Sequence, residues 1–169
     1  MRLGAIKGKS VELVLLSKEN LILWMNNEEE FSKEMNIIVD AEPIVDNLLK
    51  AFKIKIKNLN NDPGNDHWHS YFAIIYQNKI IGAIGSKGKP SNESCIEVGY
   101  GISESYRNLG IATEALKLFI NHFFKEYSIK SIVAETEKEN FASQKVLEKN
   151  CFNKIQENET ILWKIESFS

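Results

Sequence analysis

A strand, a short turn and a helix follow one another between residues 95 and 127, and this stretch constrains the fold more than any other. Apolar residues alternate along 96–102, as they do in a strand, and recur on one helical face along 115–123. The turn between them has the spacing Arg-x-x-Gly-x-Ala over residues 107–112. Such a turn leaves the first backbone N–H groups of the helix without partners, and the positive end of the helix dipole also attracts anions. We therefore predict a phosphate-binding turn at 107–112.

Three residues of this turn suit a phosphate-bearing ligand. Gly110 lets the backbone come close to the ligand, and Ala112 is small enough not to block it. Arg107 is one of only two arginines in a lysine-rich chain, the other being Arg2, and its guanidinium recognises phosphate better than an ammonium does. The spacing alone also fits an ordinary strand–turn–helix with an arginine on the surface.

Length and composition exclude several classes of protein. At 169 residues, the chain is most simply a single domain over 1–169. The net charge of −2 argues against a nucleic-acid-binding protein, and no apolar run is long enough for a membrane span or a signal peptide. Cys95 and Cys151 lack the spacing of a zinc site or a disulfide framework. We therefore expect a reduced, cytoplasmic protein that binds no metal.

The order of the predicted elements gives the fold class. Strands are predicted at 11–16, 71–76, 79–85, 96–102, 131–137, 152–156 and 161–166, and helices at 17–25, 40–59, 111–123 and 140–149. Asp40 is the predicted cap of the second helix, with Pro43 in its first turn. This order predicts an α/β (α+β) fold, with a mixed, mostly antiparallel sheet of about seven strands flanked by about four helices.

Two further clusters have alternative interpretations. Glu28 to Glu30 are a solvated surface or an acidic lip that attracts a cationic amine. His67 and His69 lack a third ligand for a metal, so we interpret them as loop residues beside Trp68, a candidate wall of an acceptor site.

Three motifs together resemble the GNAT superfamily of acetyl-CoA-dependent N-acyltransferases. They are Glu97-Val-Gly-Tyr-Gly-Ile, Arg107-Asn-Leu-Gly-Ile-Ala-Thr-Glu-Ala-Leu and Asn140-Phe-Ala-Ser-Gln-Lys-Val-Leu-Glu-Lys-Asn-Cys-Phe. The Asn-x-x-Ser form of the third motif is similar to the branch that includes ribosomal-protein N-terminal acetyltransferases. The order of elements matches from about Val11 to the end of the chain, so the resemblance implies a GNAT-like fold.

The resemblance also implies a binding site for acetyl-CoA. Its diphosphate would be held by the backbone of the turn, which comprises Arg107, Asn108, Leu109, Gly110, Ile111, Ala112 and Thr113. Two parallel strands that end near Ile102 and Thr136 would splay apart around the pantetheine arm. Tyr100, Gly101 and Ile102 would pair with that arm, and Asn140 and Ser143 would touch the pantetheine and the leaving sulfur.

The chain departs from the family pattern at two positions. Leu147 stands where many relatives have a tyrosine that acts as general acid, which leaves Ser143 as the candidate donor to the thiolate and Tyr100 or Tyr106 as alternatives. Cys151 stands where relatives have a glycine after the last helix, so we expect Asn150 to take the left-handed conformation there. We interpret Cys151 as a packed residue and not as a nucleophile.

The implied reaction is direct attack of a primary amine on the acetyl group in a ternary complex. Glu97 is the candidate general base, because its strand leads into the cofactor cleft; Glu135 is the rival, and a cross-strand ion pair is the structural alternative for Glu97. The acceptor is a peptide N-terminus or a small amine, with walls expected from 24–31, 62–70 and the last hairpin. A catalytically silent acyl-CoA-binding regulatory module is the alternative function, and a homodimer is left open.

Overall fold

A single twisted sheet organises the computed structural model, which describes residues 4–168 and leaves residues 1–3 and 169 of the predicted domain outside. Within the described residues, eight strands follow the order β1-β2-β4-β5-β6-β7-β9-β8, and a ninth, β3, pairs with β5. All neighbours are antiparallel except β3 with β5 and β6 with β7. The predicted class, mixed and mostly antiparallel, is confirmed, with nine strands in this range instead of about seven.

The bounds of the elements follow the apolar pattern of the sequence. The strands are β1 Ile6–Lys7, β2 Val11–Leu15, β3 Ile38–Val39, β4 Phe72–Tyr76, β5 Lys79–Ser86, β6 Cys95–Ile102, β7 Ser131–Glu137, β8 Asn153–Glu157 and β9 Thr160–Glu166. The helices are α1 Lys18–Asn26, α2 Glu28–Met35, α3 Asp46–Asn61, α4 Asp66–His69, α5 Ile111–Glu126 and α6 Phe141–Lys149, with a 3₁₀ turn η1 at Glu104–Tyr106. Among the described residues, no helix combines the length and the apolar character that crossing a bilayer requires.

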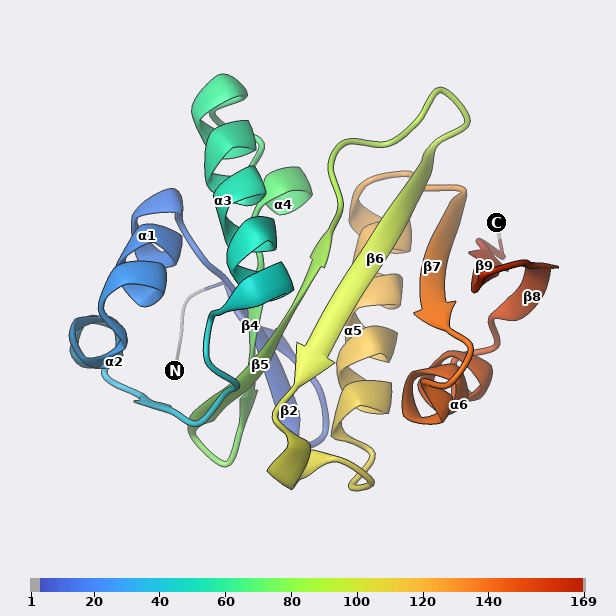
Figure 1. Cartoon of the computed structure of the whole chain (residues 1–169). Helices are drawn as coiled ribbons and strands as arrows, with labels where there is room; N and C mark the ends of the chain where they lie inside the picture. The colour runs from blue at the N-terminus through green and yellow to red at the C-terminus, as the bar shows by residue number, and fades with distance from the viewer. Residues whose placement is uncertain (1–3, 169) are drawn as a thin grey trace.

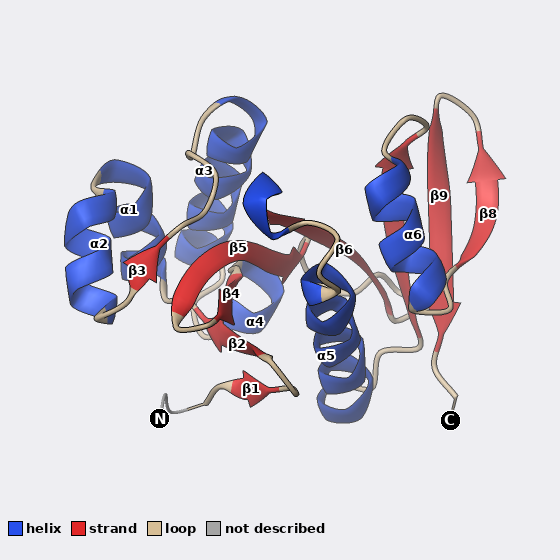
Figure 2. Ribbon diagram, turned by 90° about the horizontal axis from the view of Figure 1, so that it is seen from below, coloured by secondary structure: helices blue, strands red, loops and turns tan. Residues whose placement is uncertain are grey.

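Helices cover both faces of the sheet and bury two apolar cores. The helix α5 buries Ala115, Leu116, Phe119 and Phe123 against one face, as its periodicity predicts. The helices α1, α2 and α3 cover the other face with a smaller core that includes Trp24, Phe31 and Phe52. Figure 2 shows these three helices on one side of the molecule, α6 with β8 and β9 on the other, and α5 between them.

The strands β6 and β7 separate toward their carboxyl ends. They pair in parallel only at Cys95, Ile96 and Glu97, opposite Ser131, Ile132 and Val133. Beyond this point β6 stays paired with β5 through Ile102, and β7 stays paired with β9 through Glu137. Figure 1 shows the two arrows diverging, with β6 crossing in front of α5 and β7 beside it. The splay implied by the family resemblance is therefore present, and it leaves unpaired backbone on both facing edges.

Two predicted elements are wrong. Asp40 and Pro43 do not begin a helix: α3 begins at Asp46, and residues 40–45 are neither helix nor strand. The backbone N–H of Asp40 donates to Ile80 O, so pairing with β5 replaces the expected helix. Residues 66–69, expected in a loop, form the one-turn helix α4, where Trp68 packs against Phe123 and Tyr127.

The end of α6 also differs from the prediction. Cys151, not Asn150, takes the left-handed conformation, with φ of 66°. Asn150 is buried, and its side-chain amide donates to Thr113 O and Val146 O. These two bonds tie Asn150 to both helices, so the turn is made one residue later. Cys151 is exposed instead of packed.

Candidate active site

The turn that enters α5 has the geometry of an anion site. Gly110 adopts φ of 77°, a left-handed conformation that favours glycine, and Asn108 adopts φ of 63°. Gly110 is the N-cap of the 16-residue helix α5, and within the described residues no side chain caps this helix end. The N–H groups of its first turn therefore remain available to a ligand, at the positive end of the helix dipole.

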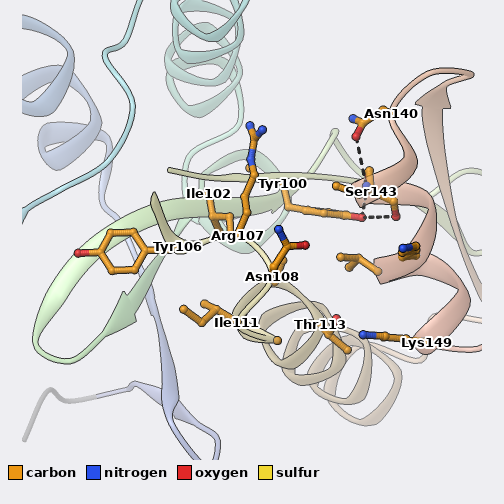
Figure 3. Close-up of a pocket in the computed structure, with 16 residues that line it drawn as sticks. Tyr100, Ile102, Tyr106, Arg107, Asn108, Ile111, Thr113, Asn140, Ser143 and Lys149 are labelled. Carbon is orange, nitrogen blue, oxygen red and sulfur yellow. Dashed lines mark hydrogen bonds between the residues drawn. The ribbon is translucent and has the colours of Figure 1, made fainter. Parts of the chain in front are cut away.

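A cavity of about 360 Å³ lies against this turn, between α5 and α6 (Figure 3). We call it the first cavity. It brings together every residue predicted to hold the cofactor except Leu109. Leu109 is 60% exposed and does not line the cavity. The predicted residues in its wall are Tyr100, Gly101, Ile102, Arg107, Asn108, Gly110, Ile111, Ala112, Thr113, Asn140 and Ser143.

A second cavity, of about 460 Å³, opens on the side of the sheet that α1 and α3 cover. We call it the second cavity. Its wall includes Trp24, Leu48, Phe52 and Tyr71 on one side and Glu135 of β7 on another. The two cavities share six residues at the splay: Tyr100, Gly101, Ile102, Arg107, Asn140 and Ser143. Ligands in the two cavities would therefore meet where β6 and β7 part.

Two hydroxyl groups lie at this junction. Tyr100 Oη and Ser143 Oγ are 2.9 Å apart, and Asn140 Oδ1 accepts from the backbone N–H of Ser143 at the start of α6. Burial raises the pKa of Tyr100 to about 12, although its hydrogen bond with Ser143 opposes the shift. Tyr100 therefore stays protonated near neutral pH and can donate to Ser143. Leu147 is fully buried in the core and supplies no polar group.

Tyr106, the other candidate donor, is engaged elsewhere. Its hydroxyl donates to the Asp40 carboxylate, which raises the pKa of Tyr106, and Figure 3 shows its ring pointing away from Ser143. A second bond joins the same two segments, from Glu104 N to Glu42 Oε1 at 2.9 Å. The 36–45 segment, which borders the second cavity through Ala41 and Glu42, is thus attached to the turn that borders the first.

The two candidate bases have different surroundings. Glu97 forms an ion pair with Lys87 and lies outside the lining of both cavities. Glu135 lines the second cavity, and among residues 4–168 it forms no ion pair. Of the two candidates, only Glu135 lies in a cavity wall, and the pairing of Glu97 with Lys87 matches the structural alternative for Glu97.

Several expected wall residues lie elsewhere. Of the residues 24–31, Trp24 lines the second cavity, whereas Glu29 and Glu30 pair with Lys33 on α2. Neither Trp68 nor the last hairpin contributes to the wall of either cavity.

Sequence reasoning missed two lysines, Lys145 and Lys149, in the wall of the first cavity. Figure 3 shows Lys149 extending from α6 toward the first turn of α5. Their helical spacing with Ala142 and Ser143 was the available signal, since residues three or four apart share a face.

Known proteins are similar to this chain in sequence. Residues 17–153 match the family described as acetyltransferase (GNAT) domain. The uncharacterized N-acetyltransferase YjdG of Bacillus subtilis (strain 168) is 34% identical over 97 residues, which are 57% of this chain and 56% of that protein. The ribosomal-protein-serine acetyltransferase of Escherichia coli (strain K12) is 29% identical over 82 residues, 48% of this chain and 45% of that one. The chain thus spans about half the length of these two relatives.

Solved structures share the fold along nearly the whole chain. The ribosomal-protein-S5-alanine acetyltransferase from Vibrio fischeri has a TM-score of 0.70 at 20% identity, with 96% of each chain covered. RimL, a ribosomal L7/L12 α-N-protein acetyltransferase in complex with coenzyme A, has a TM-score of 0.69 at 16% identity, covering 96% of this chain and 97% of that one. At this level of identity, the likeness concerns the fold.

Proposed function

Because the chain belongs to the acetyltransferase (GNAT) family, as its motifs indicated, we propose that it transfers the acetyl group of acetyl-CoA to a primary amine. The observation that carries the proposal is the pair of cavities that share their walls at the splay of β6 and β7. One cavity suits an anionic, elongated ligand and the other suits an amine. Such an arrangement favours direct transfer between two bound reactants over a covalent enzyme intermediate.

The first cavity fits acetyl-CoA, which would supply the acetyl thioester. The uncapped N-terminus of α5 offers N–H groups to a diphosphate. Among residues 4–168, only the chain neighbours of Gly110 lie within 4 Å of a Cβ added there. Arg107, Lys145 and Lys149 add positive charge to the same wall. The unpaired edge of β6 at Tyr100 to Ile102 would hydrogen-bond the pantetheine arm.

In this proposal Glu135 accepts the proton of the incoming ammonium, directly or through water, because its side chain lines the second cavity. Glu97 remains the second candidate, and its pairing with Lys87 would have to open before it could act. Ser143 donates a hydrogen bond to the leaving sulfur, and Tyr100 orients the Ser143 hydroxyl by donating to its oxygen.

The acceptor within this class is a peptide N-terminus or a small amine. The E. coli relative and the two solved structures are acetyltransferases named for ribosomal proteins, and this likeness in fold and partial sequence supports the first alternative. A cytoplasmic location and a homodimer stay predictions from the sequence.

The proposal is tested by incubating the protein with acetyl-CoA and a panel of amines and peptides, and measuring release of the CoA thiol together with the mass of the product. We expect amine-dependent thiol release and a product heavier by one acetyl group. Tight binding of acetyl-CoA without transfer to any amine would contradict the proposal and favour a regulatory acyl-CoA-binding module.

A further inference from the structure

The wall of the second cavity differs in chemistry from one end to the other. Leu48, Phe52 and Tyr71 lie at the end beneath α3, and Phe52 is in ring contact with Tyr71 at 5.3 Å between centroids. Glu135 lies on β7, at the splay. Between them the floor of the cavity is formed by Ala83 of β5 and Gly101 of β6.

The small residues of the floor keep this cavity open. Ala83 is paired with Gly101, so both lie on the same face of the sheet. Apart from its chain neighbours, no atom of the described residues lies within 4 Å of a Cβ added at Gly101, so the space above Gly101 is open. Glycine in a strand interior lowers stability, and it often marks a site where a ligand or another backbone approaches closely. The rings above and the small residues below thus bound a slot.

Two cations and two carboxylates line the second cavity. Lys87 pairs with Glu97, Arg107 lies on the wall shared with the first cavity, and Glu42 accepts a hydrogen bond from Glu104 N. Glu135 is the carboxylate at the splay, and it forms no ion pair within the described residues. In the sheet order, β7 and β5 are separated by β6, so Glu135 lies about 10 Å or more from Ala83. With a small amine at Glu135, the partly exposed Leu48 and Tyr71 would stay in contact with water, whereas an apolar arm would cover them.

We propose that the acceptor is a primary amine carried on an apolar arm of about the size of an aromatic ring, with the arm in the slot between α3 and Ala83. This inference rests on the proposed function and narrows its substrate class. The ammonium lies beside Glu135, and the arm packs under Leu48, Phe52 and Tyr71. The same chemistry occurs in a free arylalkylamine and in a peptide that begins with a large apolar residue.

The experiment compares kcat/KM for 2-phenylethylamine, ethylamine and spermidine, and for two peptides that begin with Phe or with Gly. We expect 2-phenylethylamine to exceed ethylamine by at least tenfold, and the Phe peptide to exceed the Gly peptide if the natural acceptor is a peptide. Equal values for 2-phenylethylamine and ethylamine would overturn the inference, and so would a preference for spermidine.

Two variants test the location of the arm. Leu48→Ala, which removes part of the wall, should lower kcat/KM for 2-phenylethylamine about fivefold to tenfold more than it lowers kcat/KM for ethylamine. Ala83→Leu, which fills the slot, should lower the former at least tenfold. Ile54→Ala is the matched control, because Ile54 lies on α3 but is 59% exposed and lines neither cavity. Equal losses for both amines would place the arm elsewhere and overturn the inference.

Binding separates this inference from the proposed function. Calorimetric titration of the CoA-loaded protein with 2-phenylethylamine should show binding that Leu48→Ala weakens and Ile54→Ala does not. Such binding without turnover of any amine would support the slot as a binding site for the arm and would contradict the proposed acetyl transfer. Turnover of other amines without this binding would support acetyl transfer and would overturn the inference about the slot.

Discussion

Two hydroxyl groups, those of Tyr100 and Ser143, lie 2.9 Å apart where the two cavities meet. A serine hydroxyl is a weak acid, so its task is a hydrogen bond to the sulfur as negative charge develops there. The thiolate of CoA, with a pKa near that of a cysteine thiol, leaves without full protonation. Leu147 is buried in the core and has no polar group, so it does not take over this role.

We predict that Ser143→Ala lowers kcat by one to two decades and leaves the Kd of acetyl-CoA nearly unchanged. The loss corresponds to roughly 1.5–3 kcal/mol for one hydrogen bond to developing charge. Tyr100→Phe should cost less, because Ser143 keeps its own hydroxyl. Steady-state kinetics and calorimetric titration measure the two quantities. A kcat of Ser143→Ala within twofold of wild type would assign the donor role to water or to Tyr100.

The two glutamates give a second prediction at this scale. Glu135→Gln should lower kcat by about 10²–10⁴-fold, with partial recovery as the pH rises and more of the amine is already neutral. Glu97→Gln should change kcat less than tenfold, because its carboxylate is engaged by Lys87. Rate–pH profiles of both variants make the comparison. A larger loss for Glu97→Gln than for Glu135→Gln would restore Glu97 as the base.

At the scale of elements, the 36–45 segment lines the second cavity and is hydrogen-bonded to η1, which borders the first cavity. Asp40 bonds Tyr106 and Glu42 bonds the backbone of Glu104, so this segment and η1 are held together by two contacts between distant parts of the chain. The segment carries wall residues of the second cavity, and η1 borders the first cavity. A change in the position of the segment should therefore change the shape of the proposed amine site.

We expect Tyr106→Phe, which keeps the ring and removes the bond to Asp40, to raise the KM of the amine about threefold to tenfold. Hydrogen exchange of residues 36–45 should become faster, and the Kd of acetyl-CoA should change less than threefold. Unchanged exchange together with an unchanged KM would show that the bond does not position the segment.

A second group of contacts joins α3, α4 and the β5–β6 loop. Asp62 accepts hydrogen bonds from His69 Nε2 at 2.7 Å and from Lys89 Nζ at 2.9 Å, and these bonds hold the pKa of Asp62 well below its usual range. A carboxyl whose folded pKa is lowered stabilises the fold above its unfolded pKa, about 3.9, and loses this contribution as the pH falls toward the folded pKa.

The melting temperature of wild type should therefore exceed that of Asp62→Asn most above pH 5, and the difference should shrink as the pH falls below 4. Calorimetric scans of both proteins between pH 3 and pH 7 measure this. A difference that is the same at every pH would mean that ionisation of Asp62 does not contribute.

At the scale of the whole molecule, the features predicted from the sequence are local ones. The turn at Gly110 and the strands and helices around it follow from residues within one stretch, so periodicity and spacing were sufficient. The bend at Asp40 depends on Ile80 and Tyr106, which no local pattern reveals. The slot beneath α3 likewise combines four separate segments, and Cys151 takes its conformation because Asn150 reaches Thr113.

The central claim is that the turn before α5 holds the diphosphate of acetyl-CoA, and Gly110→Asp tests it most directly. The variant adds a side chain and a negative charge at a position where aspartate tolerates positive φ better than most residues. Gly64→Asp is the matched control, because Gly64 has φ of 87°, equally open surroundings and no place in either cavity. Calorimetric titration with acetyl-CoA should show binding weakened at least tenfold in Gly110→Asp and unchanged in Gly64→Asp. Wild-type affinity in a Gly110→Asp protein with a native circular dichroism spectrum would contradict the claim.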